Sequence, residues 1–304
     1  MIALRVLNMP AIERKLYRRY LKAKTAHRPK LPALSGLEAE IVEGLRRDGL
    51  FVTTLAALGI DRTRRMVRSA DSLVQRYSQR VRAGAFRFRD TISASAHEIM
   101  AHPDIFHWGC DAALLRIVES YVELPVAYDS MALYYTVADA LQKGTRLWHR
   151  DREDRAVVKI AVYLNDVGPD GGPLQVMRRD VPQRPGLCPF DYPVLTHEKL
   201  QRRLGFAPTD KEMAELTGPA GTVIFCDTAK YYHRGKPPTR HDRGALFYCY
   251  FSQQPRHPFL CERSGLSRAH IAQLSQAYDA PKRDSARWFA RLPWPARLVP
   301  RSLV

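Results

Sequence analysis

The chain has 304 residues, 45% of them hydrophobic, and a formal net charge of +17. Such a composition can bury a sizeable core, which excludes a wholly disordered protein. No run approaches about 18 apolar residues, so no membrane-spanning helix is expected. The charge is concentrated at the ends: residues 1–35 carry +8 and residues 281–304 carry +5, which leaves +4 for the 245 residues between them. We therefore expect a near-neutral globular body with basic ends.

The cysteines and the first residues indicate the compartment. The five cysteines are an odd number and include no C-x-x-C pair, so neither a disulfide framework nor a cysteine-based zinc site is expected. The first ten residues contain only a short apolar patch and no small-residue cleavage site, which does not predict a secretory signal. These features predict a cytoplasmic protein in a reducing environment.

The first 125 residues predict mainly helices. Apolar residues at helical spacing predict helices over 11–24, 35–49, 61–82 and 111–122. Ser35 and Asp61 are candidate N-caps, and Gly49 is expected to end the second helix. The apolar run Leu50–Val52 then predicts a first strand.

After Pro125 the pattern changes to short strands separated by turns rich in Gly, Pro and Asp. The expected strands are Met131–Val137, Val157–Leu164, Leu174–Met177, Thr222–Cys226 and Ala245–Ser252. Strands at this spacing predict an antiparallel sandwich or barrel. The polar, proline-containing region 178–218 is expected to be a long insertion, either a lid over a functional site or a surface loop.

Three residues form a candidate metal site. His149 and Asp151 are two positions apart in an H-x-D triplet, so on an extended segment both side chains lie on the same face. A lone H-x-D also occurs in exposed turns, but His233 ends the apolar run 221–232 and supplies a third ligand. Two histidines and one carboxylate form the facial triad of non-haem Fe(II) oxygenases, which leaves metal positions open for a cosubstrate and oxygen.

An arginine follows at a position that suits a cosubstrate. An Fe(II) site that uses 2-oxoglutarate also needs a cation for the distal carboxylate of that molecule, and a guanidinium matches a carboxylate best. Arg243 lies ten residues after His233, at the start of the last expected strand. Arg240 is the nearby competitor, but it lies in the turn that follows Lys236–Thr239. We therefore favour Arg243.

Together these motifs resemble the phytanoyl-CoA dioxygenase family of Fe(II)/2-oxoglutarate oxygenases. The stretches that are similar to that family are residues 48–52, 159–177 and 221–233, within a resemblance that spans about 35–253. The resemblance implies an α+β fold with a mainly β core, a jelly-roll or cupin-like double-stranded β-helix with N-terminal helices packed on it. It divides the chain into a basic extension (1–34), an oxygenase domain (35–255, helical to 125 and a β-helix over 126–255) and a basic C-terminal extension (256–304).

The resemblance also implies a chemistry. His149, Asp151 and His233 would bind Fe(II), Arg243 would bind 2-oxoglutarate, and O2 would be the oxidant. The products would be succinate, CO2 and a hydroxylated small-molecule or lipid-linked substrate. Retention of the carboxylate at Asp151 implies hydroxylation rather than halogenation.

Two positions depart from the family pattern. Met177 is followed by Arg178 where the family often continues with P-G-S-H, and Gly235 stands where the family often has a serine after the distal histidine. A hydroxyl contact to 2-oxoglutarate must then come from elsewhere. Tyr135, on the strand before H-x-D, is a candidate for that contact, and a core aromatic is the alternative for it.

Other functions remain open at this stage. A nucleic-acid dealkylase would use the same ligands, although the near-neutral body lacks the expected basic groove. A non-catalytic cupin-like binding module would have no use for Arg243. The basic ends, including the aromatics and arginines of 284–301, are consistent either with contact to an anionic membrane at its cytoplasmic face or with a tail packed on the domain. Coenzyme A thioesters are not singled out by any feature.

Overall fold

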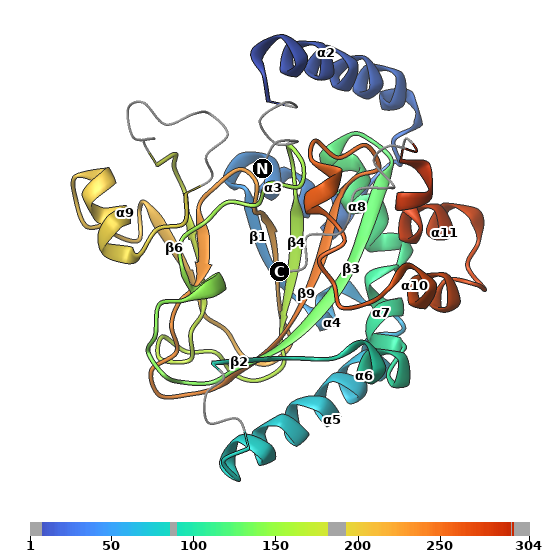
Figure 1. The fold of residues 1–304 in the computed structure, drawn as a ribbon. Helices are drawn as coiled ribbons and strands as arrows, with labels where there is room; N and C mark the ends of the chain where they lie inside the picture. Colours follow the sequence, from blue (N-terminus) through green and yellow to red (C-terminus); the bar gives the residue numbers. More distant parts are fainter. Residues whose placement is uncertain (1–7, 86–89, 182–192, 293, 295–304) are drawn as a thin grey trace.

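The computed structural model describes residues 8–85, 90–181, 193–292 and 294. Its core consists of two antiparallel sheets (Figure 1). The strands are β1 (Leu50–Thr54), β2 (Thr91–Ser93), β3 (Val126–Thr136), β4 (Val158–Tyr163), β5 (Leu174–Met177), β6 (Met213–Leu216), β7 (Thr222–Asp227), β8 (His233–Gly235) and β9 (Arg243–Ser252). The large sheet has the order β1-β7-β4-β9-β3-β2, and the small sheet has the order β6-β5-β8.

The chain passes back and forth between these sheets. β4 lies in the large sheet, β5 and β6 in the small one, β7 in the large, β8 in the small and β9 in the large. An isolated bridge between His149 and His233 adds the H-x-D segment to the edge of the small sheet. This alternation of antiparallel strands between two sheets is that of a double-stranded β-helix, so the predicted fold class is confirmed.

Helices lie around the two sheets, and most of them cover one face of the large sheet (Figure 1). They are α2 (Pro10–His27), α3 (Gly36–Asp48), α4 (Leu55–Leu58), α5 (Thr63–Arg82), α6 (Ala96–Ala101), α7 (Asp104–Gly109), α8 (Ala112–Val122), α9 (His197–Leu204), α10 (Arg268–Leu274) and α11 (Ala280–Ala286), with short 3-10 turns η1 (Arg28–Lys30), η2 (Gly144–Arg146), η3 (Pro258–Leu260) and η4 (Trp288–Arg291). A buried stripe of Met66, Ala70, Leu73 and Tyr77 at helical spacing joins α5 to the main core. The four helices predicted from spacing are all present.

The helix ends match the predictions in part. Gly49 ends α3 in the left-handed conformation, φ 71°, as expected for a glycine at that position. Asp61 is not an N-cap: α5 begins at Thr63, and its N-cap residue is Arg62, which makes no side-chain capping bond. That expectation was wrong because the chain makes a turn over the residues before Thr63.

Strand β3 begins earlier than the sequence pattern predicted and contains a bulge. Its pairing with β9 shifts between Tyr128 and Met131, and Ser130 lies in the left-handed region, φ 72°. The extra residues bend the strand and interrupt its alternation. The polar pair Asp129 and Ser130 therefore concealed the first half of an 11-residue strand.

The region 178–218 is partly core rather than a simple lid or surface loop. Strand β6 lies within it and pairs with β5 along its whole length. Leu200 of α9 is buried with Trp148 and Met177 in a separate apolar cluster. Residues 182–192 of this region lie outside the described residues.

The C-terminal segment packs on the body as far as Leu292. Trp288 is 1% exposed, and its ring meets that of Phe251 edge-on at 5.0 Å. Trp294 is 70% exposed, whereas residues 295–304, which include part of the expected basic tail, lie outside the described residues. Within the described ranges, the helices include none with the length and apolar character needed to cross a membrane.

Candidate metal centre

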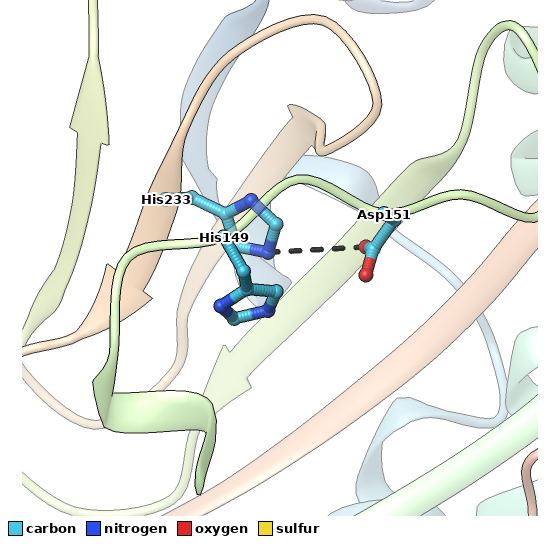
Figure 2. A group of neighbouring side chains, drawn as sticks. All are labelled: His149, Asp151 and His233. Atoms are coloured by element: carbon cyan, nitrogen blue, oxygen red, sulfur yellow. Dashed lines mark ion pairs between the residues drawn. The ribbon is translucent and has the colours of Figure 1, made fainter. Parts of the chain in front are cut away.

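The three predicted ligands come together between the sheets. His149, Asp151 and His233 each offer one ligating atom, and these atoms all lie within 4.8 Å of one another. The two imidazole centroids are 4.3 Å apart, and Nε2 of His233 lies 3.8 Å from Oδ2 of Asp151. Figure 2 shows the two rings side by side and the carboxylate facing them. The structure thus brings together residues that are up to 84 positions apart in the sequence.

Backbone hydrogen bonds hold the three ligands in place. The amides of His149 and His233 each donate to the carbonyl of the other, at 3.0 and 2.9 Å. The amide of Asp151 donates to the carbonyl of Thr228, just beyond β7, at 2.9 Å. The H-x-D segment is therefore fixed on one side by the small sheet and on the other by the end of a strand of the large sheet.

Further hydrogen bonds orient the two imidazoles. Nδ1 of His149 lies 2.7 Å from the carbonyl oxygen of Leu147, and Nδ1 of His233 lies 3.4 Å from that of Tyr231. A carbonyl only accepts, so each Nδ1 carries the proton and donates it. The Nε2 lone pair of each ring is then free for a metal, the arrangement typical of metal-binding histidines.

The protonation states suit metal binding. Burial lowers the pKa of His149, and burial together with the neighbouring His149 ring lowers the pKa of His233 to about 3. Burial alone would raise the pKa of Asp151, but Lys159 and the two histidines outweigh it and hold that pKa well below its usual range. Two neutral imidazoles and one carboxylate are thus in the forms that metals require.

Lys159 is a member of the site that the sequence motifs did not identify. Its Nζ forms an ion pair with Oδ2 of Asp151 at 2.6 Å. Burial opposes the charge on Lys159, yet Asp151 keeps its pKa above the usual value. A lysine within an otherwise apolar strand was the available signal.

The donor set fits a divalent transition metal. Imidazole nitrogens and a carboxylate are ligands that Fe(II) accepts, and three ligands leave the remaining positions of an octahedral ion open. A closed structural zinc site would instead use four protein ligands. His149, Asp151 and His233 are the single group of this kind within the described ranges.

A cavity of about 260 Å³ adjoins the three ligands and includes Arg243. Arg243 is 6% exposed, and its Nη1 donates to the carbonyl of Gly172. Burial lowers the pKa of this guanidinium, but an arginine side chain stays charged at neutral pH. Arg240, the competitor, is exposed on the surface near Asp170. The buried arginine is therefore the one that can reach a ligand in the cavity.

Gly235 makes room for this arginine. A Cβ built on Gly235 would lie 3.0 Å from Nη2 of Arg243, closer than ordinary van der Waals contact. The departure from the serine of the family pattern thus gives the guanidinium space. Nε of Arg243 is buried without a hydrogen-bond partner among the described residues.

Tyr135 lies on the other face of the sheet, which corrects its predicted role. Its hydroxyl donates to Oδ2 of Asp242 at 2.8 Å, and its ring belongs to the main core beneath the helices. Because side chains alternate along a strand, its neighbours Tyr134 and Thr136 line the cavity instead. Tyr134 is therefore the tyrosine of β3 that can contact a bound molecule.

A charged and polar group lines another part of the cavity. Nη1 of Arg263 lies 3.1 Å from Oε1 of Glu153, and the carboxylate of Asp129 accepts the amide of Glu262 at 2.9 Å. The hydroxyl of Ser130, on the β3 bulge, is buried without a partner in the described part of the chain. These lining residues were not identified from the sequence. Two of them, Asp129 and Ser130, lie in the β3 bulge, where the alternation of polar and apolar residues is interrupted.

The fold and these ligands define a double-stranded β-helix protein with a two-histidine, one-carboxylate centre. No protein-family model and no curated protein sequence matches the chain. Among solved structures, the chain is similar to HygX from Streptomyces hygroscopicus with nickel and 2-oxoglutarate bound (14% identity, 73% of this chain and 88% of HygX, TM-score 0.46).

It is also similar to AviO1 from Streptomyces viridochromogenes Tue57 (17% identity, 73% of this chain and 98% of AviO1, TM-score 0.46). A third similar structure is EctD from S. alaskensis with 2-oxoglutarate and 5-hydroxyectoine (18% identity, 73% of this chain and 79% of EctD, TM-score 0.44). These likenesses are distant, so the metal centre is assigned from its own geometry.

Proposed function

We propose that this chain is an Fe(II)- and 2-oxoglutarate-dependent dioxygenase that hydroxylates a C–H bond of a small-molecule or lipid-linked substrate. The observation that carries the proposal is the meeting of the half-buried His149 and the buried Asp151 and His233 with the buried Arg243 in one cavity. When bound, iron and 2-oxoglutarate supply the activation of O2, with succinate and CO2 as products.

The protein's own residues hold and orient the reactants. His149 and His233 offer neutral nitrogens, and Asp151 offers the anion that offsets part of the metal charge. Their positions are fixed by backbone hydrogen bonds, so little rearrangement is needed when the metal binds. Arg243 would bind the distal carboxylate of 2-oxoglutarate through a charge-assisted hydrogen bond, which its burial would strengthen.

The rest of the cavity is left for the substrate. We assign substrate contacts to Tyr134 and Ser130, whose hydroxyls can each donate and accept a hydrogen bond. Lys159 and Arg263 are paired with carboxylates, so the charges around this space are largely balanced. Met131, Leu174 and Phe247 add apolar surface to this lining, so a substrate portion with both polar groups and an apolar part fits it best.

The proposal is tested by anaerobic titration of the protein with Fe(II) and then with 2-oxoglutarate. A dioxygenase of this kind gives a weak visible charge-transfer band when both are bound. We expect the band in the natural protein and in Arg240→Gln, its loss in His233→Ala, and a need for much higher 2-oxoglutarate in Arg243→Gln.

A panel of candidate substrates assayed for succinate release then addresses turnover. A band that forms equally in His233→Ala would overturn the assignment of the metal ligands. A protein that binds Fe(II) but never 2-oxoglutarate would be a cupin-like binding module instead.

A further inference from the structure

Helix α2 presents two chemically different faces. Its inner face packs on the body, with Tyr20 against the main core. The charges on this face are paired: Lys24 with Glu123 at 3.2 Å, His27 with Glu119 at 2.7 Å, and Glu13 with Arg155 at 3.2 Å. The helix is therefore held in a defined orientation, although none of its residues is fully buried. In Figure 1 it lies along the edge of the molecule, apart from the sheets.

The outer face of α2 is basic and has no counter-charge among the residues that the structure describes. Its exposed cations are Arg14, Lys15, Arg18, Arg19 and Lys22. None of the five takes part in an ion pair among the described residues, and Glu13, the one acidic residue of the helix, points inward. These five cations repel one another, and an anionic partner would reduce that repulsion.

Apolar side chains lie among these cations. Tyr17 is 47% exposed and Leu21 is 44% exposed, and they lie one helical turn apart. Met9, just before the helix, is 51% exposed. By contrast, α5 is also rich in arginine, but none of its large hydrophobic side chains is exposed to this degree. The ring of Tyr17 also stacks on Tyr20 at 6.1 Å and lies under the guanidinium of Arg155, so about half of it remains exposed. The combination of cations with half-exposed aromatic and aliphatic side chains distinguishes α2 from an ordinary basic helix.

We propose that the outer face of α2 docks this protein onto an anionic lipid membrane. The five cations would meet lipid phosphates, while Tyr17 and Leu21 would enter the boundary between headgroups and acyl chains. A nucleic acid would also satisfy the cations, but its phosphate backbone offers no place for Leu21. The inference is independent of the oxygenase chemistry, since α2 contributes no residue to the cavity.

The test is co-flotation of the full chain with vesicles, either of phosphatidylcholine alone or with about 30% phosphatidylglycerol. We expect flotation with the anionic vesicles only, and its weakening as salt is raised above about 100 mM. The double variant Arg18→Glu/Arg19→Glu should reduce the bound fraction about tenfold or more. Arg64→Glu/Arg68→Glu on α5, at the opposite end of the molecule in Figure 1, makes the same change of charge and should bind as the natural protein does.

Other results would overturn the proposal. One is a natural protein that stays with neither kind of vesicle, and another is equal loss of binding in the α2 and α5 variants. Tyr17→Ser/Leu21→Ser distinguishes insertion from charge alone, because unchanged flotation of this variant would remove the apolar part of the proposal. Binding to a short single-stranded RNA, lost in the α2 variant and without any vesicle binding, would assign the face to nucleic acid instead. Retention of the Fe(II)/2-oxoglutarate band in all variants separates these results from failure of the proposed function.

Discussion

The cavity between the sheets and the outer face of α2 use charge in opposite ways. In the cavity, Lys159 faces the buried Asp151 and Arg263 faces the buried Glu153, so most charges there lie beside an opposite charge. On the outer face of α2, exposed cations stand without partners among the described residues. The paired charges of the cavity hold side chains in place around the candidate metal site. The unpaired cations of α2 can attract an anionic surface. The net charge of +17 therefore describes the surface of the protein better than its site.

The largest expected effect comes from removing a ligand of the metal centre. His233→Ala or Asp151→Ala should reduce succinate release by about 1000-fold or more, because the remaining two ligands neither hold nor orient the metal well. Equilibrium binding of Fe(II) or Co(II) should be lost in parallel. His241→Ala removes an exposed histidine and should change neither succinate release nor metal binding. Equal losses in the ligand variants and in His241→Ala would contradict the assignment of the metal ligands.

The second prediction compares the two candidate arginines for 2-oxoglutarate, the buried Arg243 and the exposed Arg240. Arg243→Gln should raise the KM for 2-oxoglutarate about 10- to 100-fold, the cost of a lost charge-assisted contact in a buried site. Arg240→Gln, which changes a surface side chain, should leave KM unchanged. Initial rates at varied 2-oxoglutarate measure both, and an effect of Arg240 equal to that of Arg243 would reverse the assignment.

The buried histidines also predict how stability depends on pH. The pKa of His233 is lowered by burial and by His149 to about 3 in the folded protein, whereas an unfolded imidazole takes up a proton near pH 6.5. Below that pH the unfolded state binds more protons, so the free energy of unfolding falls as pH falls. His233 alone should account for about 2 kcal/mol between pH 7 and pH 5.

Urea unfolding of the metal-free protein at several pH values measures this dependence. His233→Asn cannot titrate in this range, so its stability should fall less steeply with decreasing pH. The same steepness in both proteins would show that His233 contributes nothing to the dependence.

The smallest expected effect is at Gly235. In Gly235→Ala the new Cβ would lie 3.0 Å from Nη2 of Arg243, so the guanidinium must move by a few tenths of an ångström. We expect a rise of about two- to fivefold in the KM for 2-oxoglutarate, with unchanged metal binding. Gly168→Ala is a surface control, because Gly168 is exposed, has no positive φ, and a Cβ there meets no atom within 4 Å. An unchanged KM in Gly235→Ala would show that the position of the Arg243 guanidinium does not depend on a glycine at residue 235.

The sequence patterns led to the three candidate metal ligands but not to the residues that surround them. The H-x-D spacing and the strand before His233 are local patterns, and they led directly to three residues that the structure brings together. Strand β6 was missed because its four residues are ordered by pairing with β5 rather than by a pattern of their own.

The local sequence pattern also did not predict on which face of strand β3 a side chain lies. Tyr134 and Tyr135 are adjacent aromatics, so hydrophobicity alone does not decide which one faces the cavity. Pairing with β9 decides it, and that register is shifted by the bulge at Ser130. The bulge itself depends on tertiary contacts, such as the amide of Glu262 that binds Asp129.

The backbone bridge between His149 and His233 has a kinetic consequence. It joins segments that are 84 positions apart, and closing so long a loop costs chain entropy, which slows folding. The nascent chain therefore has no assembled site with which to capture a metal ion. A metal ion that needs all three ligands would therefore be bound only after this bridge has joined the two segments.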